Sequence, residues 1–324
     1  MDRRTFLMSV PALGVSTLAV PALAQNAFPE KPIRVICGST AGALLDAATR
    51  LYSDRMSKDL KQPLIVENLA GASSLLAARA LLRAPADGYT LLTVANTLIS
   101  MPHFSKSADY KLADFTPIGE MARSPSVLVV SAESSFKSVA DLIAAAKSTP
   151  GQVTFASGGQ GTGSHLASEL FMNQAGIKLV HVPYKGIAPA AADVVANRVG
   201  FMLSTPTSVA GLVKTGRMRI LAITSAVRSP VYPDVPTFKE LGWPNATFEI
   251  WVGIFGPASM PANVRDRIAQ AMEVARNDTG VRHKLEELGQ SVSDVRSPQA
   301  FDAFIQAEDK SIAKLIKAAH IRTD

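Results

Sequence analysis

Two short segments of small and hydroxylated residues are the strongest candidates for binding chemistry in this sequence. The first, residues 38–43, reads Gly-Ser-Thr-Ala-Gly-Ala, and the second, residues 157–164, reads Ser-Gly-Gly-Gln-Gly-Thr-Gly-Ser. Both follow apolar runs and precede apolar residues at helical spacing, so each is predicted to connect a strand to a helix. Tight turns are also built from glycine for purely structural reasons, and that alternative stays open for each loop taken alone.

Strand-to-helix loops of this composition suit an anion. A helix N-terminus presents unpaired backbone N–H groups and about half a positive charge. Glycine lets a ligand approach that backbone closely, and hydroxyls add hydrogen-bond donors without bulk. Two such loops that face each other across a cleft would hold the carboxylates of a small acid.

Other kinds of chemistry fit the sequence less well. The second loop departs from the dinucleotide-binding glycine pattern, and no P-loop signature occurs. Thr40 stands where a nucleophile elbow has serine. Ser164 and His165 are neighbours on a predicted helix and would not face each other, so a hydrolase stays only as an alternative. Asp46, one turn into the first helix, either orients its loop or meets an ammonium group on a ligand.

The cysteine and histidine content and the charge distribution argue against disulfide bonds, metal sites and nucleic-acid binding. The five histidines are scattered and the single cysteine, Cys37, lies in an apolar run. Neither an internal disulfide nor a metal cluster is therefore expected, and no cofactor is predicted. The net charge of +6 is spread along the chain without a dense Lys/Arg block, which argues against a nucleic-acid partner.

Residues 1–24 have the layout of an export signal. Arg3 and Arg4 precede a mildly apolar run, and Ala-Leu-Ala at residues 22–24 forms a small-x-small cleavage site. Paired arginines followed by Thr-Phe-Leu are typical of a twin-arginine signal, with an ordinary Sec signal as the alternative. We therefore expect residues 1–24 to be removed and the mature chain to be soluble and periplasmic.

The rest of the chain alternates strand and helix patterns, which favours an α/β fold with mainly parallel sheets. The alternation restarts near residue 126, so two similar units are predicted. A helical tail from residue 261 would pack back on the first unit, with strands crossing near residues 123–126 and 245–251. These patterns predict residues 25–124 with 250–324 as one lobe, residues 125–249 as the other, and a ligand cleft between them.

Several motifs in order resemble those of Bug-type receptors, the extracytoplasmic solute-binding proteins of tripartite tricarboxylate transporters. They are IRVICGSTAGALLDAATR, DGYTLL, SVLVV, SGGQGTGSHLASELF, HVPYKGIAPA, LAITSAVRSPVYPDVPT and WVGIFGPA, and the resemblance runs from about Pro29 to the C-terminus. It implies a type II periplasmic binding fold that closes over a small organic carboxylate without enzymatic chemistry. It also implies delivery to membrane transporter subunits, with a ligand sensor as the alternative. We expect a monomer, since nothing in the sequence signals self-association.

The resemblance also implies which residues line the cleft. The first loop would contribute Ser39, Thr40, Gly42 and Ala43, and the second Gly161, Thr162, Ser164 and His165. Three further strand-end positions would complete the site: Asn96, Thr97 and Ser204.

The sequence departs from the family pattern at several of these places. Gly38 and Ser39 replace a Pro-Phe pair, Ala43 replaces a glycine, and Ser204 replaces an aspartate. Residues 69–74, Leu-Ala-Gly-Ala-Ser-Ser, stand where the family usually has Arg-Pro-Gly-Ala-Gly-Gly. The loss of a bulky ring and an acidic group predicts a roomier, more neutral cleft. We therefore expect a larger or aromatic carboxylate as the ligand rather than an amino acid.

Overall fold

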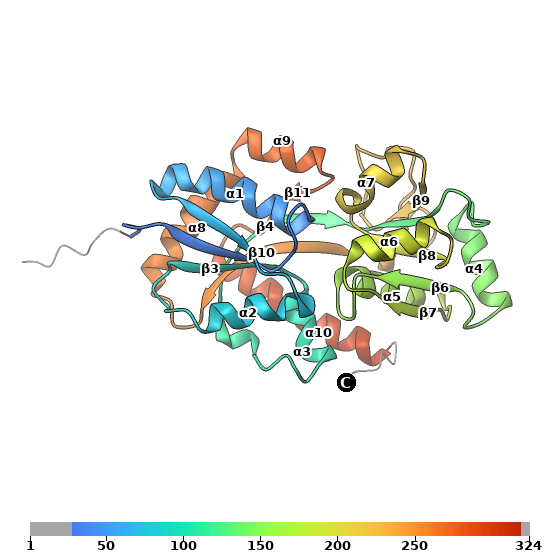
Figure 1. Ribbon diagram of the computed structural model, residues 1–324, viewed down its shortest axis with the longest axis horizontal. Coiled ribbons are helices and arrows are strands. Elements are labelled where there is room, and N and C mark those ends of the chain that lie inside the picture. Colours follow the sequence, from blue (N-terminus) through green and yellow to red (C-terminus); the bar gives the residue numbers. More distant parts are fainter. Residues whose placement is uncertain (1–27, 319–324) are drawn as a thin grey trace, which may run out of the picture.

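The chain forms two lobes, each built on its own β-sheet (Figure 1). The computed structural model describes residues 28–318, so the predicted export signal at residues 1–24 lies outside the described residues. Within residues 28–318, no helix is long and apolar enough to cross a membrane. The lobes lie side by side, and strands pass between them in the middle of the molecule (Figure 1).

The first lobe contains a six-stranded sheet with helices on both faces. Its strands are β1 (Ile33–Cys37), β2 (Leu64–Asn68), β3 (Thr90–Ala95), β4 (Phe115–Pro125), β10 (Glu249–Pro257) and β11 (Ser291–Val292). Its helices are α1 (Leu44–Leu60), α2 (Leu75–Leu82), α3 (Thr97–Phe104), α8 (Ala262–Arg276), α9 (Thr279–Glu287) and α10 (Pro298–Ala318), with short 3₁₀ turns η1 (Ala72–Ser74) and η2 (Leu112–Asp114). The strand order is β11-β4-β10-β3-β1-β2.

The alternation of side chains along β1 shows how this lobe builds its core. Val35 and Cys37 pack into a cluster with α1, α8 and α9, while Ile36 packs on the opposite face with α2, α3 and α10. Successive residues of a strand point to opposite faces of a sheet, so an unbroken apolar run suits a strand covered on both sides.

The second lobe contains a five-stranded sheet in the order β7-β6-β8-β5-β9. Its strands are β5 (Val127–Ser131), β6 (Thr154–Ser157), β7 (Val180–Pro183), β8 (Phe201–Ser204) and β9 (Met218–Ile223). Its helices are α4 (Val139–Ser148), α5 (Gly163–Ala175), α6 (Ile187–Val195) and α7 (Pro206–Lys214), with a 3₁₀ turn η3 (Pro244–Ala246). Leu128 and Val130 face α4 and α5, and Val127 and Val129 face α6 and α7.

Both sheets are mixed, which corrects the expectation of mainly parallel sheets. β1 runs parallel to β2 and β3, and β6 runs parallel to β7 and β8. In contrast, β10 is antiparallel to β3 and β4, and β5 is antiparallel to β8 and β9. The antiparallel strands arise where the chain passes between the lobes. A chain that leaves a sheet along one strand and later returns along the neighbouring strand runs in opposite directions in the two strands.

The passage between the lobes is a two-stranded ribbon. β4 ends at Pro125, and β5 of the other sheet begins two residues later at Val127. β10 pairs with β4 in antiparallel register from Glu249 opposite Pro125 to Pro257 opposite Phe115. The expected crossings near residues 123–126 and 245–251 fall on these two neighbouring strands.

Four strands and helices are not predicted from the sequence pattern: β4, α3, α7 and the two-residue β11. β4 contains Pro117, Gly119 and Pro125, which interrupt its alternation. Helix α3 contains Pro102, and α7 begins with Pro206 at its first position. Proline interrupts the residue patterns from which helices and strands are predicted, so β4, α3 and α7 depend on packing against the rest of the fold.

Candidate functional site

The first loop, residues 38–43, connects β1 to α1, as the sequence predicts. Thr40 and Gly42 are exposed, whereas Ser39 and Ala43 are half-buried. Gly42 adopts a left-handed conformation with φ of 78°, and its N–H donates to Asp46 Oδ2 at 2.9 Å. Helix α1 then begins after Ala43 without a side-chain cap. The first amides of α1 are therefore not occupied by a capping side chain.

Asp46 orients this loop, which is one of the two roles open from the sequence. Besides Gly42, its carboxylate accepts hydrogen bonds from Arg50 and Asn68, and the residue is 3 % exposed. Burial alone would raise its pKa, but the hydrogen bonds from Arg50, Asn68 and Gly42 outweigh that effect and lower the pKa below the usual value. Asn68 also donates to Ser39 O, which ties the far side of the loop to β2.

The second loop connects β6 to α5, and most of its own amides bond within the loop. Gly158 N–H donates to Ser164 Oγ at 3.0 Å, and Gly159 N–H donates to Ser157 Oγ at 3.2 Å. Thr162 Oγ1 donates to Gly159 O and lies 2.9 Å from Ser164 Oγ. Thr162 is the N-cap residue of α5, yet its side chain makes no capping bond to the helix. The amides left for a ligand are thus those at the start of α5.

Both backbone polar groups of Gly161, its N–H and its carbonyl, are already hydrogen-bonded within the protein. Its N–H donates to His165 Nδ1 at 3.1 Å, and its carbonyl accepts from Ser100 Oγ of α3 at 2.6 Å. Its φ of 72° favours glycine, and an added Cβ would lie 3.0 Å from the Phe104 ring. Gly161 therefore shapes the loop against α3, and its own amide is not free for an anion.

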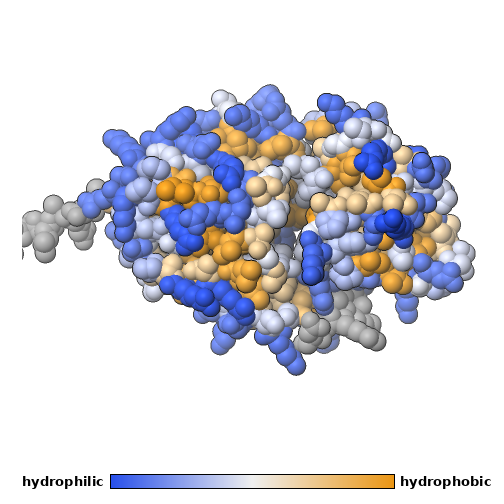
Figure 2. All heavy atoms as spheres, in the orientation of Figure 1, coloured by the Kyte–Doolittle hydropathy of each residue, from blue (hydrophilic) through white to orange (hydrophobic). Residues whose placement is uncertain are grey.

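The two lobes meet where the second loop contacts η1 and α3. Ser73 Oγ donates to Gln160 O at 3.3 Å, which adds to the bond between Ser100 and Gly161. Ser74 Oγ donates to Gly38 O at 2.9 Å, so η1 also holds the first loop. Figure 2 shows a groove between the two lobes. η1 and α3 link both predicted loops, a function that the sequence motifs do not indicate.

The backbone of η1 is strained. Ala72, Ser73 and Ser74 have φ values of 44°, 52° and 71°, the left-handed region that non-glycine residues rarely adopt. Ser73 and Ser74 occupy the places where the family pattern has two glycines. The hydroxyl bonds to Gln160 and Gly38 offset part of the strain, and strain of this kind concentrates at binding sites.

The three strand-end candidates differ in what they offer a ligand. Thr97 Oγ1 donates to Ser74 Oγ at 3.3 Å and lies beside η1. Asn96 is fully buried, and its amide bonds Glu308 of α10 and the Trp251 N–H of β10. Ser204 is 1 % exposed, and its hydroxyl has no partner among the described residues. Asn96 therefore positions its neighbours, while Ser204 retains an unused donor and acceptor.

A stack of aromatic rings crosses the junction between the lobes. The ring centroids of Phe155 and His181 are 4.8 Å apart and those of His181 and His165 are 4.1 Å apart, and the ring planes in both pairs are nearly parallel. His165 in turn lies 5.3 Å from Phe104, which belongs to α3 of the other lobe. His165 Nδ1 accepts the Gly161 N–H at 3.1 Å, and its Nε2 lies 3.4 Å from Glu169 Oε1.

The geometry does not favour the hydrolase alternative. Ser164 Oγ bonds Gly158 and Thr162, and His165 is turned toward Gly161 and Glu169. Ser157 Oγ does lie 2.6 Å from His181 Nε2, but Ser157 is fully buried. A nucleophile needs a base and access to the substrate, and neither serine combines the two.

The electrostatics of the two loops come from the backbone. Residues 38–43 and 158–165 contain no Asp, Glu, Lys or Arg. Within residues 28–318, no group of three or more His, Cys, Asp and Glu is placed to hold a metal ion. The arrangement can bind an anion through helix amides and hydroxyls.

Two substitutions at Ser74 should separate the energetic cost of its left-handed backbone from the stabilisation by its hydroxyl hydrogen bond. Ser74→Ala keeps the strained backbone and loses the bond to Gly38 O, so we expect the free energy of unfolding to fall by about 1–2 kcal/mol. Ser74→Gly loses the same bond but relieves about 1 kcal/mol of left-handed strain. Denaturant unfolding should therefore give a higher free energy of unfolding for Ser74→Gly than for Ser74→Ala. The reverse order would show that the backbone at Ser74 is not strained.

The pKa of His181 predicts how stability depends on pH. Burial, together with the charge of His165, lowers the pKa of His181 to about 3. An unfolded histidine titrates near 6.5, so below about pH 6.5 the unfolded state binds a proton that the folded state excludes. The melting temperature should fall between pH 7.5 and pH 5, and it should fall less in His181→Gln. An equal fall in both proteins would show that His181 is not responsible.

Comparisons with known proteins agree with the two-lobed architecture. A model of the family described as "Tripartite tricarboxylate transporter family receptor" matches residues 48–321. The "UPF0065 protein in tcbD-tcbE intergenic region" of Pseudomonas sp. (strain P51) is 35% identical over 318 residues, which cover 98% of this chain and 94% of that protein.

Two solved structures resemble the chain over nearly their whole length. "R. palustris Rpa4515 with adipate" has a TM-score of 0.85 at 29% identity and covers 92% of this chain and 100% of its own. "Structure of periplasmic binding protein BugD" has a TM-score of 0.83 at 26% identity, with the same coverage. These likenesses confirm the expected type II periplasmic binding fold. The chain therefore belongs to the family of Bug-type receptors of tripartite tricarboxylate transporters.

Proposed function

We propose that this chain is a periplasmic receptor that captures a small organic carboxylate between its lobes and delivers it to membrane transporter subunits. The observation that carries the proposal is the pair of helices α1 and α5, which both begin without a side-chain cap after loops that are bonded to η1. Their free amides and dipoles supply a favourable place for negative charge. Membership of a transporter receptor family supports the delivery step.

Each lobe would contribute donors to one bound carboxylate. Ser39, Thr40 and the first amides of α1 would act from one lobe, with Thr97 beside them. Thr162, Ser164 and the first amides of α5 would act from the other lobe. Ser204 adds a buried hydroxyl that has no partner among residues 28–318. No covalent step is part of this function.

Contacts to both lobes would close the receptor. A ligand shifts a conformational equilibrium only by its difference in affinity for the two states. A carboxylate that touches both α1 and α5 gains its second set of contacts only when the lobes approach. The two-stranded ribbon of β4 and β10 would serve as the hinge for that movement.

The ligand class follows from the uncharged loops. No acidic or basic side chain lies in residues 38–43 or 158–165, so nothing there matches the ammonium group of an amino acid. Asp46, the nearest acidic residue of α1, is already bonded to Arg50, Asn68 and Gly42. We therefore propose a di- or tricarboxylate or an aromatic carboxylate, and the related protein solved with adipate is an example of a receptor for a dicarboxylic acid.

A panel of acids tests the ligand class. Thermal shift and calorimetry against adipate, citrate, benzoate, aspartate and glutamate should give binding by one or more of the first three and none by the amino acids. A ligand at about 100 times its dissociation constant should stabilise the protein by ~2.7 kcal/mol. Tight binding of aspartate or glutamate alone would reject the class that we propose.

Two variants then test the site with the ligand so identified. Thr162→Val and Ser39→Val remove one hydroxyl each, and loss of a hydrogen bond of about 1 kcal/mol should weaken binding roughly five- to tenfold. Thr215→Val, at the exposed end of α7, is the matched control and should bind as the wild type does. Unchanged affinity in both site variants, with unchanged melting temperature, would place the ligand elsewhere.

A further inference from the structure

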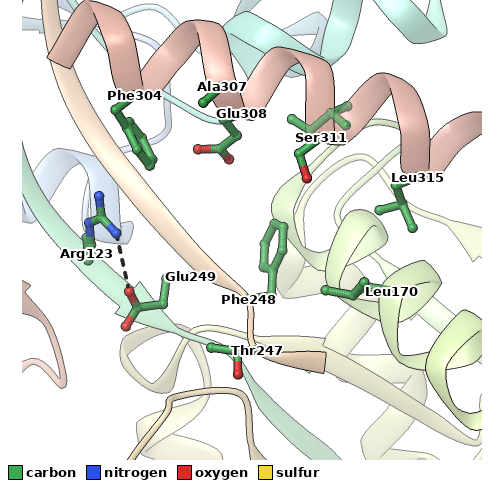
Figure 3. Close-up of a pocket in the computed structure, with 11 residues that line it drawn as sticks. Arg123, Leu170, Thr247, Phe248, Glu249, Phe304, Ala307, Glu308, Ser311 and Leu315 are labelled. Atoms are coloured by element: carbon green, nitrogen blue, oxygen red, sulfur yellow. Dashed lines mark ion pairs between the residues drawn. The ribbon is translucent and has the colours of Figure 1, made fainter. Parts of the chain in front are cut away.

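A second pocket lies beside α10, away from the uncharged loops. It has a volume of about 450 Å³ and is walled by α10, the start of β10, Arg123 of β4 and Leu170 of α5 (Figure 3). Phe304 and Glu308 point from α10 toward β10, and the Phe248 ring points back toward α10 (Figure 3). We call this the α10 pocket.

Negative charge exceeds positive charge around the α10 pocket. Among residues 28–318, Arg123 is the only cation that lines it, and its guanidinium already bonds both carboxylate oxygens of Glu120. Arg123 also lies 3.7 Å from Glu249 and 4.6 Å from the centre of the Phe304 ring. Arg123 is therefore shared between two carboxylates and one aromatic face before Glu308 is considered.

Glu308 forms no ion pair among residues 28–318, although the charge of Arg123 acts on it from a distance. Its Oε1 accepts a hydrogen bond from the Asn96 amide at 2.7 Å, and Asn96 is uncharged. Burial is the main cause that raises the pKa of Glu308 to about 7, and the charge of Glu120 raises it further. A carboxyl group in this state gains from any cation that reaches it.

The geometry points to the α10 pocket as a binding site for a small organic cation, namely a protonated primary amine that carries an apolar group. The ammonium group would lie at Glu308, where a charge-assisted hydrogen bond replaces an unpaired carboxylate. The apolar group would lie between Phe248 and Phe304 and against Leu315, and the aromatic faces would also attract the cation. This inference uses no residue of the proposed carboxylate site as a ligand contact, so either can fail without the other.

Benzylammonium and its neutral counterpart benzyl alcohol are the probes. Calorimetry at pH 8 should show saturable binding of benzylammonium and at least tenfold weaker binding of benzyl alcohol. Glu308→Gln should weaken benzylammonium binding at least tenfold, and the exposed Glu286→Gln of α9 should leave it unchanged. The absence of saturable binding, or equal binding of both probes, would overturn the proposal.

The pH dependence of benzylammonium binding gives a second readout. Within residues 28–318, the charged groups around Glu308 are Glu120 and Arg123 of β4 and Glu249 of β10. The uncharged Leu170 of α5 lines the pocket, and Asn96, the residue before α3, bonds Glu308. With a pKa of about 7, Glu308 is roughly ten times less ionised at pH 6 than at pH 8. Affinity for the amine should fall about tenfold over that range and should be flat in Glu308→Gln.

An arginine introduced beside Glu308 tests, without a ligand, whether Glu308 lacks a cationic partner. Ser311 lines the α10 pocket three residues after Glu308, so the two side chains are neighbours on one helix face. Ser311→Arg should abolish benzylammonium binding and raise the melting temperature, whereas the uncharged Ser311→Gln should not raise it. If the rise persisted when Ser311→Arg is combined with Glu308→Gln, pairing with Glu308 would be excluded as its cause.

Discussion

The pairing of β4 with β10 is the constraint on which the rest of the structure depends. β4 runs out of the first sheet into β5 of the second, and β10 lies beside β4 along its whole length. Because the two strands are hydrogen-bonded to each other, the lobes share one ribbon instead of two independent linkers. A ribbon resists stretching and sliding but bends readily, so the proposed relative motion of the lobes would be largely an opening and closing. At this junction η1 bonds the loop before α1 and the loop before α5.

Local sequence signals were sufficient for the two loops and most of the strands. Small residues between an apolar run and a helical pattern mark the connections that precede α1 and α5, and these are properties of neighbouring residues. β4 carries no such signal, because Pro117, Gly119 and Pro125 interrupt it and only its pairing with β10 makes it a strand. Local sequence also does not indicate that the sheets are mixed, since strand direction depends on the order in which the chain passes through the two lobes.

Contacts between distant residues explain what the sequence could not indicate about the candidate site. Ser100 and Phe104 reach Gly161 and His165 across the junction, and nothing in the pattern of α3 signals this. Asn96 was a reasonable candidate for a ligand contact as a polar residue at a strand end. Its amide instead bonds Glu308, 212 residues later in the chain. Residue type shows that a buried amide needs partners, but only the fold shows which ones it has.

The ring stack gives the molecule its own indicator of lobe separation. The His165 ring stacks on His181 of its own lobe and also contacts the tilted ring of Phe104, which belongs to the opposite lobe. If the lobes open as proposed, Phe104 would withdraw while His181 stays in place, so one of the two ring contacts would be lost and the other would not change. The magnetic shielding of the His165 ring protons by Phe104 depends on that distance. His165 would thus have a proton resonance that reports on the proposed domain opening without any introduced label.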